Sequence, residues 1–292
     1  FLMYICNQCP RKCSVDRSEA VGICGVGQNY KVARAALHYW EEPCISGKKG
    51  SGTVFFSGCP LKCVYCQNSS ISDGCFGKEI SEKRLIEIFK ELEAQGANNI
   101  NLVSPTHYAE QLSVTLSKYK PSIPVVYNTG GYDSVDTLKK LEGLVDVFLT
   151  DIKYVSPTVS KKYSRAENYF EVASKAVLEM RRQQPEDIFE EGILKKGLII
   201  RHLVLPGNIS QGIKALEWIN GNLSSNTIIS LMGQYMPCAR ASEFPTINRK
   251  INHREYETVL SKAEMLGFEN VYIQELDSSS EEFIPDFDLQ GV

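Results

Sequence analysis

The stretch SGCPLKCVYCQN at residues 57–68 determines how the rest of the chain is interpreted. It places Cys59, Cys63 and Cys66 directly after the apolar run Thr53–Ser57, which is predicted to be a β-strand. Thiolates are the usual ligands of iron–sulfur clusters, and a closed [4Fe–4S] cluster takes four of them. Three thiolates leave one iron without a protein ligand, and an open coordination position is typical of a catalytic metal site. The spacing therefore favours a cluster that a small molecule can bind directly.

Two other metal sites fit the same spacing. A zinc site would need a fourth ligand near by, and Cys44 and Cys75 are available for it. The three cysteines also fit a fragment of an ordinary ferredoxin site. Their position after the first strand of a series of strands and helices favours the open cluster.

Short apolar runs alternate with segments of helical periodicity beyond the cysteine loop. The predicted strands are Thr53–Ser57, Asn99–Ser104, Pro124–Thr129, Val147–Lys153, Leu198–Leu205, Thr227–Met232 and Asn270–Glu275. Helix starts are predicted at Ser81, at Ser156 followed by Pro157, at Ser210, and at Asn252 with Glu255 as a capping box. Such alternation implies parallel strands with right-handed crossovers. We therefore predict an α/β fold in which residues 51–278 form a partial (βα)6-type barrel, with its chemistry at the carboxyl ends of the strands.

Cysteine is concentrated in the first quarter of the chain, where residues 1–75 hold nine of the ten cysteines. Four of them follow the pattern C-x2-C-x3-C-x10-C in a segment with little apolar content, namely Cys6, Cys9, Cys13 and Cys24. A segment of this kind would fold only around a metal. We therefore predict a Cys-rich metal-binding lobe over residues 1–50, in which zinc and a second iron–sulfur cluster both fit the four thiolates.

Charge and hydropathy exclude two broad classes of function. The net charge is −3, and no basic stripe of the kind that binds nucleic acid is present. No segment approaches the roughly 20 apolar residues needed to span a membrane. The first residues carry no basic segment of a signal peptide, and clustered cysteines outside a disulfide framework suit a reducing compartment. We therefore expect a cytoplasmic protein.

The sequence resembles the radical S-adenosylmethionine (SAM) superfamily, and most closely its group of pyruvate formate-lyase activating enzyme-like proteins. The resemblance covers essentially the whole chain and rests first on the C-x3-C-x2-C motif with the aromatic Tyr65 before its last cysteine. The runs that indicate the subgroup are VARAALHYWEEPCISG (32–47), GTVFFSGCPLKCVYCQN (52–68), YNTGGYD (127–133), DVFLTDIKY (146–154) and RHLVLPGN (201–208).

The resemblance implies an enzyme that binds SAM at the open iron of a [4Fe–4S] cluster. Reductive cleavage of SAM would yield a 5′-deoxyadenosyl radical that abstracts hydrogen from a substrate, with flavodoxin or ferredoxin as electron donor. That substrate is a small molecule or a peptide, or alternatively a glycyl-radical enzyme that the chain would activate. A non-catalytic iron–sulfur electron-transfer protein would explain the cysteines but not the barrel scaffold.

The remaining site residues follow from the resemblance and from positions at strand ends. Many members carry Gly-Gly-Glu after the second strand, whereas this chain has Val103-Ser104-Pro105-Thr106-His107. The predicted cofactor-binding residues are Tyr65, Thr106, His107, Asn128, Asp151, Lys153 and Arg201. Neighbours on a strand face opposite sides, so Arg201 is preferred over His202. Cys238 is the predicted catalytic residue near the substrate, with a buried structural thiol as the alternative. The C-terminal tail, residues 279–292, is expected to fold over the barrel mouth or stay loose.

Overall fold

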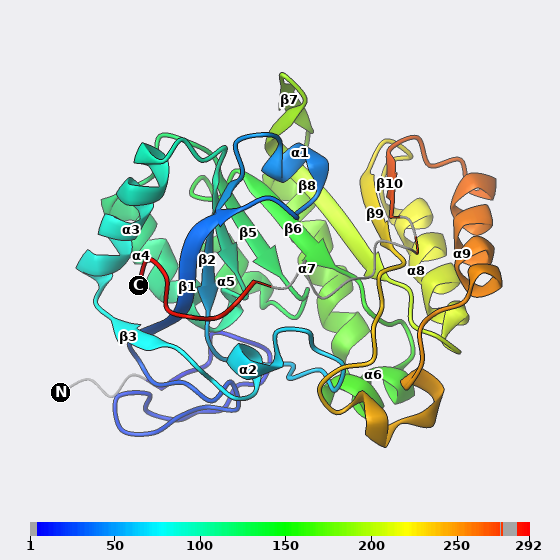
Figure 1. Ribbon diagram of the computed structural model, residues 1–292, viewed down its shortest axis with the longest axis horizontal. Helices are drawn as coiled ribbons and strands as arrows, with labels where there is room; N and C mark the ends of the chain where they lie inside the picture. The colour runs from blue at the N-terminus through cyan, green and yellow to red at the C-terminus, as the bar shows by residue number, and fades with distance from the viewer. Residues whose placement is uncertain (1–4, 275, 277–284) are drawn as a thin grey trace.

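The computed structural model describes residues 5–274, 276 and 285–292. Its main feature is a ten-stranded sheet with the strand order β10-β9-β8-β6-β5-β4-β2-β1-β3, to which β7 is added beside β8 (Figure 1). The strands are β1 (Tyr30–His38), β2 (Ser51–Phe56), β3 (Lys78–Ile80), β4 (Ile100–Val103), β5 (Val125–Thr129), β6 (Val147–Asp151), β7 (Ile188–Glu190), β8 (Ile193–Leu203), β9 (Ile228–Met232) and β10 (Val271–Ile273).

Helices connect the parallel strands from β2 to β10. The helices are α1 (Pro43–Ser46), α2 (Ser69–Ser72), α3 (Glu82–Ala94), α4 (Ala109–Lys118), α5 (Val135–Lys139), α6 (Pro157–Ser164), α7 (Tyr169–Gln183), α8 (Ile209–Asn222) and α9 (His253–Met265), with short 3-10 turns η1 (Thr106–Tyr108), η2 (Ala241–Glu243) and η3 (Pro245–Ile247). Each neighbouring pair from β2 to β10 is parallel, while β1 is antiparallel to β2 and to β3. This arrangement confirms the predicted α/β fold, and β3 and β10 stand at opposite ends of an open sheet.

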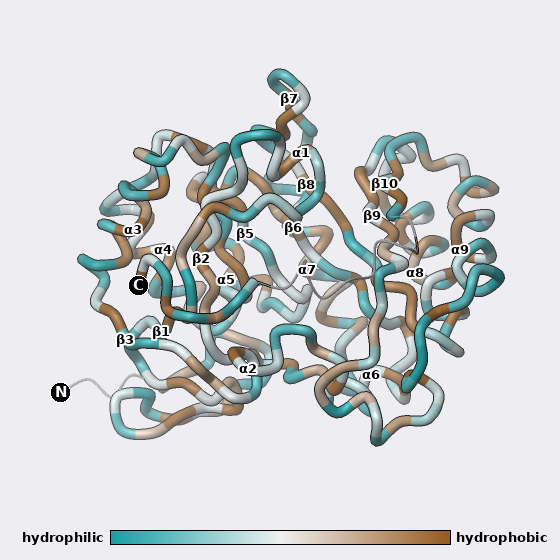
Figure 2. The backbone as a smooth tube through the Cα atoms, in the orientation of Figure 1, coloured by the Kyte–Doolittle hydropathy of each residue, from teal (hydrophilic) through white to brown (hydrophobic). Residues whose placement is uncertain are grey.

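The two faces of the sheet bury different cores because side chains alternate along each strand. On β6, Phe148 packs outward among residues of α7 and α8, whereas Val147 and Leu149 point to the opposite face. There they meet Cys44 and Ile45 of α1, which fills the amino-terminal end of the barrel interior. Much of β8 and β9 is accordingly coloured as hydrophobic in the chain trace (Figure 2).

Helix starts agree with the sequence prediction in all but one case. The hydroxyl of Ser81 accepts a hydrogen bond from the N–H of Arg84, and α6 begins at Pro157. The capping box of Asn252 and Glu255 opens α9 as predicted. The prediction for Ser210 is wrong: α8 begins at Ile209 after Asn208, because the chain has already turned at Pro206-Gly207.

Strand β1 differs most from the sequence interpretation. The sequence division assigns residues 30–38 to the Cys-rich lobe, whereas the structure pairs them with β2 and buries Val32 and Ala33 completely. A register shift between Val32 and Arg34 breaks the apolar–polar alternation, so the usual strand pattern is absent. The domain boundary at residue 50 remains a proposal, and residues 5–29 are the part of the lobe outside the main sheet.

The lobe and the C-terminal tail both lie at the end of the sheet formed by β1–β3 (Figure 1). The N–H of Cys59 donates to the carbonyl of Cys24 at 3.2 Å, which joins the lobe to the cysteine loop. In the described part of the tail, Leu289 and Gln290 form backbone hydrogen bonds with Ala33 and Ala35 of β1. Residues 279–284 of the predicted tail lie outside the described residues. None of the helices described here has the length and apolar character needed to cross a membrane.

Candidate functional site

A cavity of about 250 Å³ opens at the carboxyl ends of the parallel strands. Strands β5, β6 and β8 contribute Asn128, Asp151 and Arg201, and Lys153 follows β6. The cysteine loop after β2 supplies Cys63, Tyr65 and Cys66. The remaining lining residues are His38, Trp40, Glu41, Phe55, Gln67, Asn68, Val103, Leu203, Met232, Gln234, Tyr235, Met236 and Pro285. The structure thus brings most of the predicted cofactor-binding residues to the same cavity as two of the three loop cysteines.

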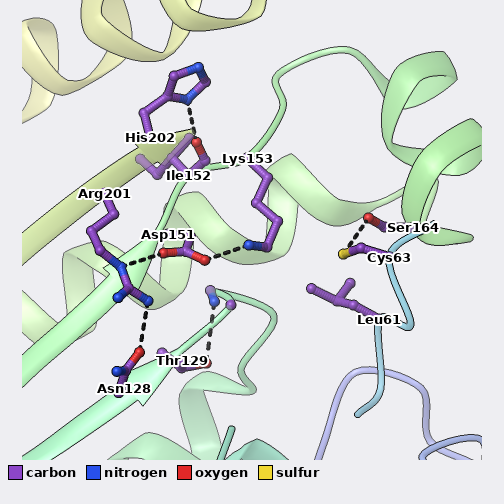
Figure 3. A network of polar contacts seen from close by, with 12 residues as sticks. Leu61, Cys63, Asn128, Thr129, Asp151, Ile152, Lys153, Ser164, Arg201 and His202 are labelled. Atoms are coloured by element: carbon purple, nitrogen blue, oxygen red, sulfur yellow. Dashed lines mark hydrogen bonds and ion pairs between the residues drawn. The ribbon is translucent and has the colours of Figure 1, made fainter. Parts of the chain in front are cut away.

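A network of charged side chains forms the wall opposite the cysteine loop (Figure 3). The carboxylate of Asp151 accepts from Arg201 Nε at 2.8 Å through one oxygen and from Lys153 Nζ through the other. Burial opposes ionisation of Asp151, but the two cations outweigh it and hold its pKa below the ordinary value. Asp151 is therefore a carboxylate at neutral pH, and it fixes two cations at the edge of the cavity.

Glu41 is a cavity residue that the sequence interpretation missed. Its carboxylate accepts from Asn128 Nδ2 at 3.1 Å and lies 3.4 Å from Arg201 Nη1. Burial raises the pKa of Glu41 even though Arg201 opposes the rise. Glu41 lies in the segment between β1 and α1, which is not the carboxyl end of a predicted strand, so the search for site residues at strand ends did not include it. Its only sequence signal is its place within the run at 32–47.

Arg201 and His202 face opposite sides of β8. Arg201 lies in the cavity and donates to Asn128 Oδ1 at 2.7 Å. The ring of His202 lies away from the cavity, and its Nδ1 is 2.6 Å from the carbonyl of Ile152 (Figure 3). This placement follows the strand alternation on which the preference for Arg201 depends.

Each sulfur of the cysteine loop has a hydrogen-bonding neighbour. Cys59 Sγ accepts from the N–H of Leu61 at 3.4 Å and Cys66 Sγ from the hydroxyl of Ser72 at 3.3 Å. Cys63 Sγ lies 3.0 Å from the hydroxyl of Ser164. N–H and O–H groups aimed at sulfur are the partners that stabilise cluster thiolates.

Burial and repulsion from the neighbouring Cys63 both act on the thiols of Cys59 and Cys66. They raise the pKa of Cys59 to about 12 and that of Cys66 to about 11. A positively charged metal core would reverse that preference and hold the three residues as thiolates. The donor set therefore fits an iron–sulfur cluster.

Tyr65 is held by an aromatic cluster beside the loop. Its ring packs edge-on against those of Tyr154, Tyr163 and Tyr235. Its hydroxyl lies 2.6 Å from that of Tyr154, which lies 2.8 Å from Ser164 Oγ. A hydrogen-bonded chain therefore runs from Tyr65 through Tyr154 and Ser164 to Cys63, and no pattern in the sequence indicates its two middle members.

Thr106 and His107 do not reach the cavity. The chain leaves β4 through Ser104, whose φ of 58° turns the following residues behind the strand ends. Thr106 Oγ1 lies 3.0 Å from Thr129 Oγ1, and His107 Nε2 lies 2.8 Å from the carbonyl of Ser57. Burial and the nearby Arg17 lower the pKa of His107 to about 3, so its ring is neutral. Both side chains have buried structural partners and lie apart from the other predicted cofactor-binding residues.

Cys238 lies in a neighbouring groove. That groove has a volume of about 510 Å³ and shares Gln67, Met236 and Pro285 with the cavity. The thiol of Cys238 donates to the carbonyl of Tyr65 at 3.2 Å. The predicted catalytic residue is therefore next to the cysteine loop but outside the lining of the main cavity.

Cys6, Cys13 and Cys24 of the lobe all lie near enough to Cys9 to act on its thiol. Cys6, Cys9 and Cys24 are buried, and Cys13 is partly exposed. A Cβ added to Gly22 would lie 3.4 Å from Cys13 Sγ and 3.6 Å from Cys24 Sγ, which is ordinary van der Waals contact, so Gly22 lies directly beside both sulfurs. Burial, together with the other three thiols, raises the pKa of Cys9 to about 12.

This donor set fits a metal held by thiolates. In the described residues, however, no three His, Cys, Asp or Glu side chains are arranged around a single ion-sized position. The metal assignments therefore stay predictions.

Comparison with known proteins identifies relatives of the chain. The family model described as Radical SAM superfamily matches residues 53–207. An uncharacterized protein of Methanocaldococcus jannaschii is 32% identical over 277 residues, which cover 91% of this chain and 76% of that protein.

Solved structures share the fold at low sequence identity. Streptococcus suis SuiB bound to its precursor peptide SuiA aligns with a TM-score of 0.51 and 13% identity, over 78% of this chain and 49% of SuiB. The chain thus spans about half the length of SuiB. A domain of pyruvate-formate lyase-activating enzyme from Bacteroides vulgatus aligns over 66% of this chain and 91% of that domain, with 14% identity and a TM-score of 0.38, which is too low to support an argument.

Proposed function

Because the chain belongs to the radical SAM superfamily, we propose that Cys59, Cys63 and Cys66 hold a [4Fe–4S] cluster with SAM bound in the adjoining cavity. With both groups bound, one-electron reduction would cleave SAM and supply a 5′-deoxyadenosyl radical that abstracts hydrogen from the substrate. The observation that carries this proposal is the shared cavity, in which Cys63 and Cys66 face the network of Asp151, Lys153 and Arg201.

The network is suited to position a molecule that carries both charges and hydroxyl groups. Lys153 lies between Asp151 and the cysteine loop, where its ammonium would pair with the carboxylate of a bound cofactor (Figure 3). Asn128 and Glu41 would accept or donate hydrogen bonds to hydroxyl groups deeper in the cavity. The aromatic cluster around Tyr65 keeps water from one side of the loop, which protects a reactive intermediate from side reactions.

The neighbouring groove would bind the substrate. It adjoins the cavity and is lined by Phe76, Met236, Phe287 and other largely apolar side chains, so it would take a small molecule or a peptide. Cys238 in its wall is the proposed catalytic residue that touches the substrate. A glycyl-radical enzyme remains the second candidate, because a protruding glycine loop would use the same entrance.

The lobe would hold a second metal, either zinc or an iron–sulfur cluster, on Cys6, Cys9, Cys13 and Cys24. A flavodoxin or ferredoxin would supply electrons. The proposal of a second metal rests on the spacing of these four cysteines and on the contact of Cys24 with the cysteine loop, whereas the proposal of an electron donor rests on the need for one-electron reduction.

The test compares anaerobically reconstituted wild-type protein with Cys63→Ala and Cys44→Ala. Cys44 is a matched control because it is buried in α1, away from the cavity lining. Iron, sulfide and zinc are quantified, and release of 5′-deoxyadenosine from SAM is assayed after reduction. We expect release by wild type and by Cys44→Ala but not by Cys63→Ala. A wild-type protein with a full cluster complement that neither binds nor cleaves SAM would contradict the proposal.

A further inference from the structure

Three buried hydroxyl groups form a line that ends on the sulfur of Cys63, and we call Tyr65, Tyr154 and Ser164 the hydroxyl chain. The hydroxyl of Tyr154 lies 2.6 Å from that of Tyr65 and 2.8 Å from Ser164 Oγ. Ser164 Oγ in turn lies 3.0 Å from Cys63 Sγ. Ser164 and Tyr154 are completely buried, and Tyr65 is nearly so. Each hydroxyl therefore finds its hydrogen-bonding partners within the line and not in bulk water.

The number of protons fixes the direction in which these hydrogen bonds are donated. A serine or a neutral tyrosine donates one hydrogen bond, whereas a cysteine thiolate can only accept. The three protons match the three links when each hydroxyl donates toward the sulfur. The opposite direction would leave the proton of Tyr65 without an acceptor, because in the described part of the chain its hydroxyl has Tyr154 as its only hydrogen-bonding partner. All three hydroxyl dipoles therefore point toward a thiolate at Cys63.

The backbone around Ser164 is fixed against the cysteine loop. Ser164 is the last residue of α6, and the carbonyl of Tyr163 before it accepts from the N–H of Val64 at 2.9 Å. Arg11 donates to the carbonyl of Ser164 at 3.0 Å and to that of Pro60 at 2.8 Å. These contacts join the end of α6 to the loop on both sides of the sulfur, so they hold the hydroxyl of Ser164 beside it.

A hydroxyl dipole aimed at a cluster sulfur favours reduction of the cluster. Reduction adds one electron, and the added negative charge strengthens each hydrogen bond donated to sulfur, which raises the reduction potential. Each hydroxyl farther along the line polarises the one before it, so a chain of donors acts more strongly than a single donor. The hydrogen bonds to the other two sulfurs come from residues of the same loop and of α2, and no such chain stands behind them.

We propose that the hydroxyl chain raises the reduction potential of the iron–sulfur cluster through the hydrogen bond from Ser164 to Cys63. Tyr154 and Tyr65 are positioning residues, because they act on the sulfur through Ser164. This inference rests on the cluster of the proposed function and adds the side chains that set its potential. The electron comes from the proposed flavodoxin or ferredoxin, and no proton moves, since each hydroxyl keeps its own.

The experiment measures the midpoint potential of the cluster in the anaerobically reconstituted full chain without SAM. The protein is titrated with dithionite, and the reduced cluster is followed by electron paramagnetic resonance. Wild type is compared with Ser164→Ala, Tyr154→Phe and Tyr163→Phe. Tyr163 is a matched control, because its ring packs against Tyr65 and Tyr154 but its hydroxyl is not part of the hydroxyl chain. Pulsed measurements in H₂O and D₂O detect the exchangeable proton that Ser164 donates to the sulfur.

The hydroxyl chain predicts a specific order of potentials. At the wild-type midpoint, Ser164→Ala should lower the ratio of reduced to oxidised cluster by roughly threefold, which is about 28 mV for a one-electron couple, and should lose the exchangeable proton. Tyr154→Phe should shift the potential in the same direction by less, and Tyr163→Phe should match wild type. An unchanged potential in Ser164→Ala would overturn the inference alone if the protein still cleaves SAM. If Ser164→Ala assembles no cluster, Tyr154→Phe decides, and a shift no larger than that of Tyr163→Phe would overturn the inference. A wild-type protein that assembles no cluster would remove the proposed function itself.

Discussion

Replacing Asp151 with asparagine should show how much the ion pairs of the candidate site contribute to the free energy of unfolding. The substitution keeps the shape of the side chain but leaves two cations without their shared carboxylate. Arg201 retains Glu41 at 3.4 Å, whereas Lys153 keeps no carboxylate partner among the described residues. The side chains of Asp151, Lys153 and Arg201 are only 10–18% exposed, so the two ion pairs of Asp151 behave as buried ones. Breaking a buried ion pair costs about 3–5 kcal/mol of stability. Because Arg201 keeps one carboxylate partner, we expect a cost at the lower end of this range, about 3 kcal/mol.

The assay is thermal unfolding of the anaerobically reconstituted protein at pH 7, followed by circular dichroism. A loss of about 3 kcal/mol corresponds to a fall in Tm of roughly 6–12 °C for a chain of this size. Glu171→Gln is the control, because it breaks an ion pair whose two side chains are more than 60% exposed and should leave Tm unchanged. Because the folded pKa of Asp151 lies below its ordinary value, its contribution is present at pH 7 and is lost as the pH falls through the folded pKa. A fall in Tm of less than about 2 °C at pH 7 would refute the reasoning.

Three further variants test the scaffold around the site. Gly131→Ala should abolish SAM binding in equilibrium dialysis, because a Cβ there would lie 2.2 Å from the carbonyl of Asp151. Gly96→Ala is the control: Gly96 also has a positive φ but has open space around it, so this variant should bind SAM normally. Glu255→Gln should lower Tm at pH 7. Hydrogen bonds donated by Arg249 lower the pKa of Glu255 from 4.5 to about 2. The Tm values of the variant and the wild type should therefore converge as the pH falls through that range. A difference in Tm that stays constant with pH would argue against the ion pair. Phe287→Ala should lower stability by about 1–2 kcal/mol in urea unfolding, because this half-buried ring packs edge-on against β2; an unchanged midpoint would mean that the tail is not anchored there.

The alternation of strands and helices can be predicted from the sequence, because the spacing of apolar residues along each segment reflects which of its sides is buried. Each predicted strand matches an observed one to within a few residues except at β8, which starts five residues earlier than expected, whereas β1, β3 and β7 have no predicted counterpart. Strand β1 was not predicted because its register shift disrupts the pattern on which such a prediction depends. The placement of Asp151 and Arg201 also follows from the sequence, since parallel strands bring their carboxyl ends to one edge.

The sequence by itself determined the superfamily and the α/β fold, because these depend on spacing and periodicity along the chain, and the same spacing predicts which cysteines serve as metal ligands. Tertiary structure decided what required distant segments to meet. It brought Glu41 into the cavity from outside the repeating units and turned Thr106 and His107 away from it. These outcomes depend on which carbonyls and charges share an enclosed space, and no local pattern in the chain records that information.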